Sequence, residues 1–258
     1  MGGDVAIAYE VASELIKLAK EQGWLDRLLN VFRKQHKILL LGSTGVGKTN
    51  MLQSLTELIP EAIDYMSRTE FAKKHRVKVS RQPFIFIDTP GQALHVSRRS
   101  EEIRNAMKDG IDGVINVVCY GYHEYRQASG NAIKKSNKVR EPYLEQHRQI
   151  EIDALDEWTF LLGDRTVTNW LITVITKADL WWNQKDEVFQ YYEKGPYYDA
   201  LGEAIKLNPV FIEYCSVFHK FYGRGPLAGS FDETDRARTK AHLLRILLEA
   251  IGKSGPNG

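Results

Sequence analysis

The first 35 residues carry apolar side chains at helical spacing. This pattern predicts a helical arm from Asp4 to about Gln35 that is interrupted at Gly23. Its polar face mixes glutamate with lysine, whereas the polar face of a membrane-surface helix is usually basic. We therefore expect the arm to pack on the rest of the chain or on a partner. The apolar positions are Ala8, Val11, Ala12, Leu15, Ile16, Ala19, Leu25, Leu28, Leu29 and Phe32.

Six short segments farther along have the pattern of strands. Segment 76–79 alternates between apolar and polar residues, and the other five are apolar runs at 37–41, 83–87, 113–119, 170–175 and 209–217. Helical patterns lie between or after them, including 143–162 and 233–251, and we expect the helix after the first run to end at Ile59-Pro60. The alternation predicts an α/β fold, a three-layer sandwich with a mostly parallel six-stranded sheet and helices on both faces.

The run at 37–41 leads directly into G-x-x-x-x-G-K-T, residues 42–49. The glycines let the backbone curl with its N–H groups pointing inward, and the following helix adds the positive end of its dipole. Lys48 would reach the outer phosphates of a nucleotide, and the Thr49 hydroxyl would bind Mg²⁺. A glycine-rich turn without a ligand would need neither side chain. The expected nucleotide-binding residues are Ser43, Thr44, Gly45, Val46, Gly47, Lys48, Thr49 and Asn50.

A second motif, Asp88-Thr89-Pro90-Gly91-Gln92, follows the run at 83–87. An aspartate at the carboxyl end of such a strand, downstream of a phosphate loop, is placed to hold Mg²⁺ through its water shell. Gly91 would let the backbone approach the terminal phosphate, and Gln92 would orient an attacking water. Without the phosphate loop, the same segment would be an ordinary turn.

A third motif, Thr176-Lys177-Ala178-Asp179, follows the run at 170–175. A carboxylate at Asp179 would accept hydrogen bonds from N1–H and the exocyclic amine of guanine, a pattern that adenine does not offer. We therefore expect GTP as the nucleotide, with Thr176, Lys177 and Asp179 at its base. Taken alone, these four residues are a weak signal, and the alternative is an ordinary turn at the start of a helix.

The composition indicates one large domain with extensions. The chain has 258 residues, 43% of them hydrophobic, and a formal net charge of +2, which gives no strong field toward nucleic acid or an anionic membrane. Cys119 and Cys215 each lie in an apolar run, which favours a reduced compartment over a disulfide framework. No window is as long and apolar as a membrane span, so we expect a cytoplasmic protein.

Two segments do not follow the rhythm of strands and helices. Residues 120–142 carry interleaved aromatic and basic side chains and predict an inserted loop, either one that grips RNA or a protein or an ordinary solvated loop. The aromatic residues at 181–198 predict either a partner surface or a satellite of the core.

In their order, the motifs at 42–49, 88–92, 176–179 and 215–217 resemble those of the Ras-like GTPases, P-loop GTPases of the TRAFAC class. The spelling D-T-P-G is also common in the translation-factor and ribosome-associated branches. The resemblance covers a GTPase domain at 37–251, with the insert at about 120–142. Residues 1–36 are then a helical extension, and residues 252–258 a flexible tail.

The resemblance adds roles that the motifs do not give by themselves. It implies that Thr69 is the switch threonine that closes over Mg²⁺ and the terminal phosphate, and that the backbone near Ser216 and Val217 contacts guanine. Thr176 stands where the family usually has an asparagine that ties this loop to the phosphate loop, which implies weaker guanine binding. Val217-Phe218 stands where the family usually has a small residue and a lysine.

We therefore expect a Mg²⁺-dependent GTPase that acts as a molecular switch. Its catalytic residues would be Gln92, Lys48 and Thr69. Its metal ligands would be Thr49, Thr69 and Asp88. The expected partners are GTP or GDP and a protein effector or regulator, with weaker support for nucleic acid or the ribosome.

The charge-stabilising arginine is missing from these motifs. Arg68 is a poor candidate because neighbours on an extended chain point to opposite faces, so we expect slow turnover without a partner. Two other functions fit the same motifs. One is a GTP-loaded assembly or scaffold module with negligible hydrolysis, and the other is an ATP-dependent phosphotransferase.

Overall fold

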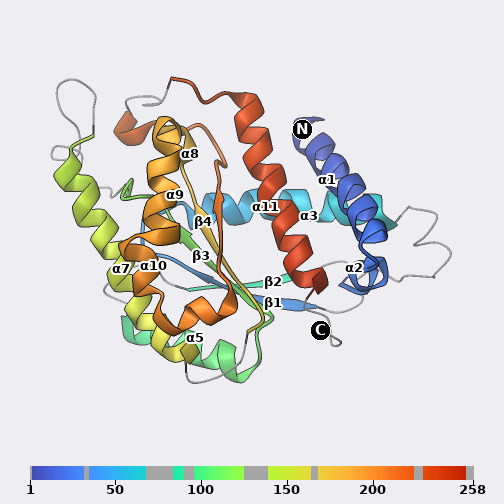
Figure 1. The fold of residues 1–258 in the computed structure, drawn as a ribbon, viewed down its shortest axis with the longest axis horizontal. Coiled ribbons are helices and arrows are strands. Elements are labelled where there is room, and N and C mark those ends of the chain that lie inside the picture. Colours follow the sequence, from blue (N-terminus) through green and yellow to red (C-terminus); the bar gives the residue numbers. More distant parts are fainter. Residues whose placement is uncertain are drawn as a thin grey trace.

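The computed structural model describes residues 2–31, 35–67, 84–89, 96–124, 139–163, 168–223 and 229–253. Its strands are β1 (His36–Leu41), β2 (Phe84–Asp88), β3 (Gly113–Val118), β4 (Leu171–Ile175) and β5 (Val210–Glu213). They form one parallel sheet in the order β2-β1-β3-β4-β5 (Figure 1). The predicted α/β fold with a parallel sheet is confirmed, and the sixth predicted strand, at 76–79, lies outside the described residues.

Helices cover both faces of this sheet. Crossovers between parallel strands are right-handed. The chain steps from β1 to β2 in one direction and from β2 to β5 in the other, so the first crossover helix lies on the opposite face from the later ones. The helices after the N-terminal arm are α3 (Lys48–Ser67), α5 (Val96–Lys108), α7 (Glu141–Gly163), α8 (Ala178–Trp181), α9 (Lys185–Lys194), α10 (Pro196–Ala200) and α11 (Glu233–Lys253), with 3-10 turns at 182–184, 202–207 and 221–223.

Helix α3 continues past Pro60 and ends at Ser67, so the expected end at Ile59-Pro60 is wrong. A proline inside a helix removes one hydrogen bond and costs about 3 kcal/mol. The turns beyond it bury Ile63 and Met66 in the core that α3 shares with the N-terminal arm. Because burying each such side chain contributes about 1.5–3 kcal/mol, this packing outweighs the cost of the proline.

The N-terminal arm consists of α1 (Gly2–Glu21) and α2 (Leu25–Val31), separated at Gly23, where φ is +73°. Helix α1 packs on α3 and α11 (Figure 1), and Asp4 forms an ion pair of 2.9 Å with Lys240 of α11. The apolar stripe of α1 is buried in these contacts, so of the two expected packing sites, the rest of the chain and a partner, the structure shows the first. Among the described helices, none combines the length and the apolar character needed to cross a membrane.

The aromatic residues around α9 and α10 belong to the core. Trp181, Tyr192 and Tyr197 are at most 1% exposed. The rings of Tyr192 and Tyr197 meet edge to face with their centroids 4.7 Å apart, and Asn116 of β3 donates a hydrogen bond of 2.5 Å to the Tyr197 hydroxyl. For these three residues, the prediction that the segment packs as a satellite of the core is confirmed, and not the alternative of a partner surface.

Candidate functional site

The direction of strand addition changes at β1, because β2 lies on one side of it and β3 on the other. In open α/β sheets, ligands bind in the crevice beyond the carboxyl ends of the strands at such a point. The glycine-rich loop at 42–47 connects β1 to α3 in this position. The fold therefore places the predicted phosphate loop where a ligand site is expected.

The backbone of this loop lies very close to its neighbours. Gly42 has a φ of +134°, and a Cβ atom there would come within 2.4 Å of the carbonyl oxygen of Val117 in β3. Gly45 has a φ of +82°, and its Cβ would lie 2.7 Å from the carbonyl oxygen of Glu124. Glycine is required at both positions, for the dihedral angle and for the space.

Lys48 begins α3, and its ammonium group lies against the loop. Its Nζ donates hydrogen bonds to the carbonyl oxygens of Gly42 at 2.6 Å and of Ser43 at 3.4 Å. Asp88, at the end of β2, pairs in register with Leu40 of β1. Burial raises the pKa of the Asp88 carboxyl, and the positive charge of Lys48 acts in the opposite direction. The two charged groups therefore interact electrostatically at the carboxyl edge of the sheet.

Two of the predicted metal ligands, Thr49 and Asp88, are described, and both side chains reach solvent, although the Asp88 carboxyl is partly shielded. A hydroxyl and a carboxylate are hard oxygen donors of the kind that Mg²⁺ binds, and Mg²⁺ takes its other ligands from water and substrate phosphates. The donor set therefore fits Mg²⁺. The other residues predicted to act around the terminal phosphate, Thr69, Gly91 and Gln92, lie outside the described residues.

Two side chains of the 176–179 motif form hydrogen bonds to the phosphate loop. Thr176 donates a hydrogen bond from its hydroxyl to the carbonyl oxygen of Val46. Lys177 donates hydrogen bonds from Nζ to the carbonyl oxygens of Gly45 at 2.8 Å and of Tyr122 at 2.6 Å. The loop after β4 and the turn after β3 thereby hold the phosphate loop from one side.

A pocket opens between the phosphate loop, the 176–179 motif and the segment after β5. Most of its lining was predicted from the sequence. Two other predicted residues of the loop, Ser43 and Val46, have buried side chains and do not line the pocket. The lining residues are Gly45, Gly47, Asn50, Glu124, Thr176, Lys177, Ser216, Val217 and His219.

Asp179, the predicted guanine-binding residue, is fully buried and is not part of this lining. Its Oδ2 accepts the backbone N–H of His219 at 2.5 Å, and its Oδ1 accepts the Cys215 thiol at 3.5 Å. Burial raises the pKa of the Asp179 carboxyl, and the hydrogen bond from His219 lowers it. The structure thus brings Asp179 close to the pocket but directs its carboxylate at the 215–219 segment.

Two residues of the pocket lining, Glu124 and His219, are not among those predicted from the sequence. Glu124 Oε2 accepts a hydrogen bond from the imidazole of His219, and its Oε1 accepts the backbone N–H of Tyr222 at 2.6 Å. Burial acts to raise the pKa of Glu124, but these hydrogen bonds outweigh it and lower the pKa. Glu124 therefore fixes the segment that covers Asp179.

The start of the predicted insert is not an exposed loop, because Tyr120, Tyr122 and His123 are at most 5% exposed. Tyr120 and Tyr122 are therefore not available to stack on RNA bases. Residues 125–138, the central part of the predicted insert, lie outside the described residues. The signal that could have identified residues 120–124 is their place directly after a buried strand, at the carboxyl edge of the sheet.

A cluster of buried polar side chains lies behind the phosphate loop. Ser43 Oγ is 2.8 Å from His123 Nε2, and His123 Nδ1 is 3.6 Å from Cys119 Sγ and 3.9 Å from Glu151 Oε1. Glu151, from α7, accepts the backbone N–H groups of Cys119 at 2.9 Å and of Gly121 at 3.2 Å. Burial lowers the pKa of His123 to about 3 and raises the pKa of the Glu151 carboxyl. This cluster connects α7 to the phosphate loop.

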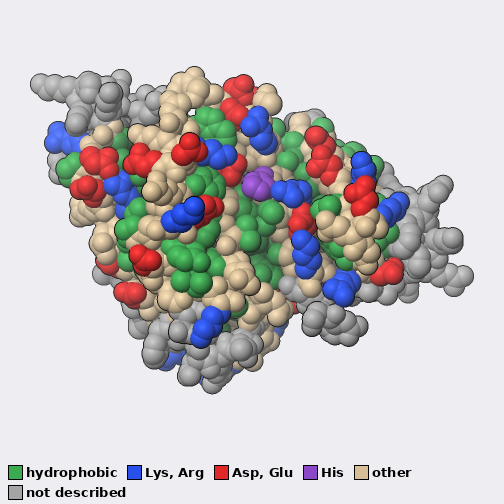
Figure 2. Space-filling model, in the orientation of Figure 1, with side chains coloured by type: hydrophobic (Ala, Val, Ile, Leu, Met, Phe, Trp, Pro, Cys, Tyr) green, Lys and Arg blue, Asp and Glu red, His purple; other side chains and the backbone are tan. Residues whose placement is uncertain are grey.

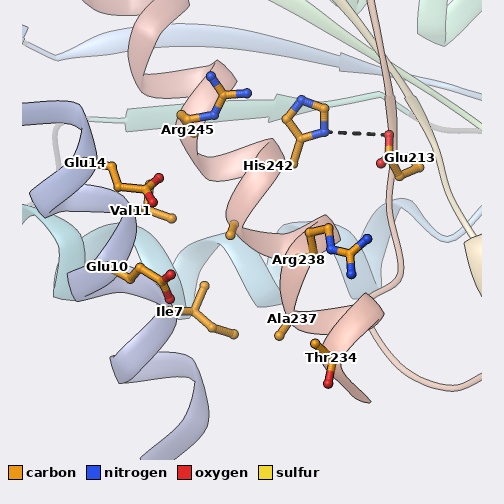
Figure 3. Close-up of a pocket in the computed structure, with 11 residues that line it drawn as sticks. Ile7, Glu10, Val11, Glu14, Glu213, Thr234, Ala237, Arg238, His242 and Arg245 are labelled. Carbon is orange, nitrogen blue, oxygen red and sulfur yellow. Dashed lines mark ion pairs between the residues drawn. The ribbon is translucent and has the colours of Figure 1, made fainter. Parts of the chain in front are cut away.

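A second concavity lies between α1 and α11 (Figure 3). Glu10 and Glu14 project from α1, and Arg238 and Arg245 project from α11. The groove contains no part of the phosphate loop, so it is separate from the nucleotide-binding candidate. The face drawn in Figure 2 mixes acidic and basic side chains, in keeping with the low net charge.

Comparison with known proteins supports part of this assignment. Residues 37–152 match a family model described as 50S ribosome-binding GTPase. The matched region runs from β1 into α7 and contains the phosphate loop and Asp88, but not the 176–179 motif or β5. No curated protein matches the chain.

Among solved structures, the chain is similar to the GTPase-like domain of Ski7 from S. cerevisiae, which was crystallised with GDP and inorganic phosphate. The sequence identity is 15% and the TM-score is 0.40. The alignment covers 84% of this chain and 50% of the other, so this chain spans about half the length of that neighbour. The family match and the phosphate-loop geometry together support a P-loop GTPase domain that binds GTP.

Proposed function

We propose that the chain is a Mg²⁺-dependent GTPase that acts as a molecular switch for a protein effector. One observation carries the proposal. The glycine loop lies at the point where strand addition reverses, with Lys48 and Asp88 at its edge, inside the region that matches a GTPase family. The buried Thr44 hydroxyl in this loop has no hydrogen-bond partner among the described residues, and a phosphate oxygen would provide one.

In the proposed mechanism, the side chains and backbone of this protein position the triphosphate and the attacking water. The N–H groups of the loop and of the first turn of α3 would bind phosphate oxygens. Lys48 would turn its ammonium group from the loop carbonyls to the outer phosphates. Thr49, Thr69 and Asp88 would hold Mg²⁺, which when bound neutralises charge on the phosphates. Gln92 would orient the water.

The switch would depend on contacts to the terminal phosphate. Thr69 and Gly91 would both bind it, and its loss on hydrolysis would release the two segments that carry them. An effector that recognises these segments would then distinguish GTP from GDP. We expect turnover to be slow without a partner, because a charge-stabilising arginine is often supplied in trans.

Recognition of guanine requires a change near Asp179. Its carboxylate now accepts the His219 N–H, and the same oxygen would have to accept N–H groups of guanine. We propose that the 215–219 segment moves when GTP enters the pocket. Ser216 and Val217, which line the pocket, would then contact the base.

The binding part of the proposal is tested by calorimetry with GTP, with ATP and with Mg²⁺ present. Lys48→Ala should weaken GTP binding by about 10- to 150-fold, since hydrogen bonds to charged groups contribute about 1.5–3 kcal/mol. Lys37→Ala is the matched control, because Lys37 lies at the opposite end of β1 and its ammonium group bonds to the Asp109 carbonyl oxygen. Unchanged binding in Lys48→Ala would reject the site, and equal affinity for ATP would reject the guanine assignment.

The hydrolytic part is tested by single-turnover phosphate release, with and without cell extract. Gln92→Leu should lower turnover and leave GTP affinity unchanged, because the side chain would act only on the water. Unchanged hydrolysis in this variant would show that another group positions the water. Absence of hydrolysis in the wild-type protein under both conditions would favour the assembly or scaffold module.

A further inference from the structure

The buried cluster behind the phosphate loop contains three side chains of types that bind metals. Cys119 and His123 are fully buried in the turn after β3, and Glu151 of α7 is 2% exposed. One ligand atom from each residue lies within 4.8 Å of the other two. We propose that Cys119, His123 and Glu151 hold a zinc ion, at a site separate from the proposed Mg²⁺ site.

One of the distances between the ligand atoms matches a tetrahedral zinc site, and the others are somewhat longer or bounded from above. His123 Nδ1 lies 3.6 Å from Cys119 Sγ, and bonds of about 2.3 Å to sulfur and about 2.0 Å to nitrogen at a tetrahedral ion place such atoms about 3.6 Å apart. The separation from Nδ1 to Glu151 Oε1 is 3.9 Å. One ligand atom from each of the three residues lies within 4.8 Å of the other two, so a single ion can contact all three after small shifts of the side chains.

The surroundings of the cluster resemble the outer shell of a metal site. A metal-bound histidine usually donates its other ring N–H to an acceptor, which fixes the orientation of the ring. The other nitrogen of His123 lies 2.8 Å from Ser43 Oγ. Ligating carboxylates are also hydrogen-bonded, and Glu151 Oε2 accepts the Tyr192 hydroxyl at 2.6 Å. Zinc would therefore hold His123 against the phosphate loop.

The backbone between the two turn ligands adopts a conformation that most residues avoid. Tyr120 has a φ of +53°, and Gly121 has a φ of +80°. A Cβ at Gly121 would lie 2.4 Å from the Leu144 carbonyl oxygen. Positive φ at a non-glycine residue costs about 1–3 kcal/mol, and residues in such conformations cluster at ligand and active sites. Here this conformation places Cys119 and His123 side by side.

The donor types select the metal. A thiolate with an imidazole favours zinc over Mg²⁺ and Ca²⁺, which prefer oxygen ligands. The two negative charges of a thiolate and a carboxylate balance the charge of one Zn²⁺, so the filled site carries no net charge into the core. Three protein ligands leave the fourth tetrahedral position to water.

The test uses the whole 258-residue chain without nucleotide, stripped of metal with a chelator and then titrated with Co²⁺ as a spectroscopic probe. We expect one Co²⁺ per chain and a thiolate-to-cobalt charge-transfer band, which one equivalent of Zn²⁺ removes. Cys119→Ser should abolish the band. Cys215→Ser is the matched control, since Cys215 is the other buried free cysteine, and it should keep the band.

Two further variants keep the result clear if Cys119→Ser folds poorly. His123→Gln and Glu151→Gln should each weaken Zn²⁺ affinity by at least about 100-fold, the upper end of the loss seen when outer-shell partners are changed. In the wild-type protein, Zn²⁺ should also raise the melting temperature. Wild-type protein that binds neither ion stoichiometrically would overturn the proposal, and so would a band that survives in Cys119→Ser. GTP binding by the metal-stripped protein in Mg²⁺ is measured alongside, and its retention or loss bears only on the proposed GTPase.

Discussion

The hydroxyl of Thr176 donates a hydrogen bond to the carbonyl oxygen of Val46, so the loop after β4 is tied to the phosphate loop. In the Ras-like GTPases that the motifs resemble, this position is usually an asparagine, and its side chain connects the two loops. Threonine makes the same kind of connection in this chain, and Lys177 adds a second one to Gly45. The replacement therefore gives no structural reason for weaker nucleotide binding.

Removing this tie should weaken nucleotide binding. Thr176→Val keeps the shape of the side chain and removes the hydroxyl, which leaves the Val46 carbonyl without this donor. A hydrogen bond contributes about 0.5–1.5 kcal/mol, so we expect GDP and GTP affinity to fall by about 2- to 12-fold in calorimetry. Thr168→Val is the control, because Thr168 bonds to the carbonyl oxygens of Asp112 and Trp170 before β4 begins. Equal losses of nucleotide affinity in Thr176→Val and Thr168→Val would show that the lost contact to Val46 is not the cause.

Releasing Glu124 should speed nucleotide entry. Glu124 holds the His219 imidazole and the Tyr222 N–H, and His219 in turn covers the carboxylate of Asp179. In Glu124→Ala, we expect the association rate of a fluorescent guanine nucleotide to rise, because the covering segment loses both anchors. Glu141→Ala is the control, since Glu141 forms an ion pair with Arg148 and does not line the pocket. A slower or unchanged association rate in Glu124→Ala would contradict the role of this segment as a cover.

The Glu213 carboxylate should make stability depend on acid pH. Burial acts to raise its pKa, but hydrogen bonds from His242 and Lys185 outweigh it and hold the pKa at about 2, below the unfolded value of 4.5. Its contribution, at most about 3 kcal/mol, is therefore present above pH 4.5 and is lost as the pH falls toward 2. The unfolding free energy of Glu213→Gln should be lower than wild type at pH 7, and the difference should shrink between pH 4.5 and 2.

The control for Glu213 is Glu57→Gln, at an exposed position of α3. Its unfolding free energy should stay within about 0.5 kcal/mol of wild type at every pH. Denaturant titrations of the three proteins across this pH range supply the comparison. A pH-independent deficit in Glu213→Gln would mean that packing, not charge, stabilises the folded state at this position.

The N-terminal arm should be required for stability although it precedes the matched family region. Leu15 is fully buried between α1 and its neighbours, so Leu15→Ala should lower the unfolding free energy by about 2–5 kcal/mol. Glu14→Ala changes an exposed neighbour and should cost less than about 0.5 kcal/mol. Thermal or denaturant unfolding measures both. If the unfolding free energy of Leu15→Ala equalled that of the wild-type protein, the arm would contribute little to stability.

Much of the fold follows from patterns that are local in the sequence. The apolar runs at β3 and β4 are buried at every position, and the stripe of α1 is buried as its spacing predicts. The phosphate loop is equally local, because its glycine spacing and its place between a strand and a helix fix the backbone. Pro60 shows the limit of such rules, since packing of the later turns of α3 overrides the tendency of proline to end a helix.

The rest of the candidate site depends on contacts between distant segments. Ser43 and His123 are 80 residues apart, and the covering pair of Glu124 and His219 is 95 residues apart. No periodicity or motif connects such positions, because the sheet order brings them together. Asp179 illustrates the same difficulty, since its motif predicts its place after β4 but not the His219 N–H that its carboxylate accepts.

The packing of α1 also bears on how the chain folds during synthesis. Asp4 and Lys240, which join α1 to α11, are 236 residues apart, whereas α3 follows α1 closely. A nascent chain can pair α1 with α3 early, but the face of α1 that meets α11 stays uncovered until translation has passed residue 240. Ribosome-bound intermediates of this protein should therefore present an apolar helix face that chaperones bind.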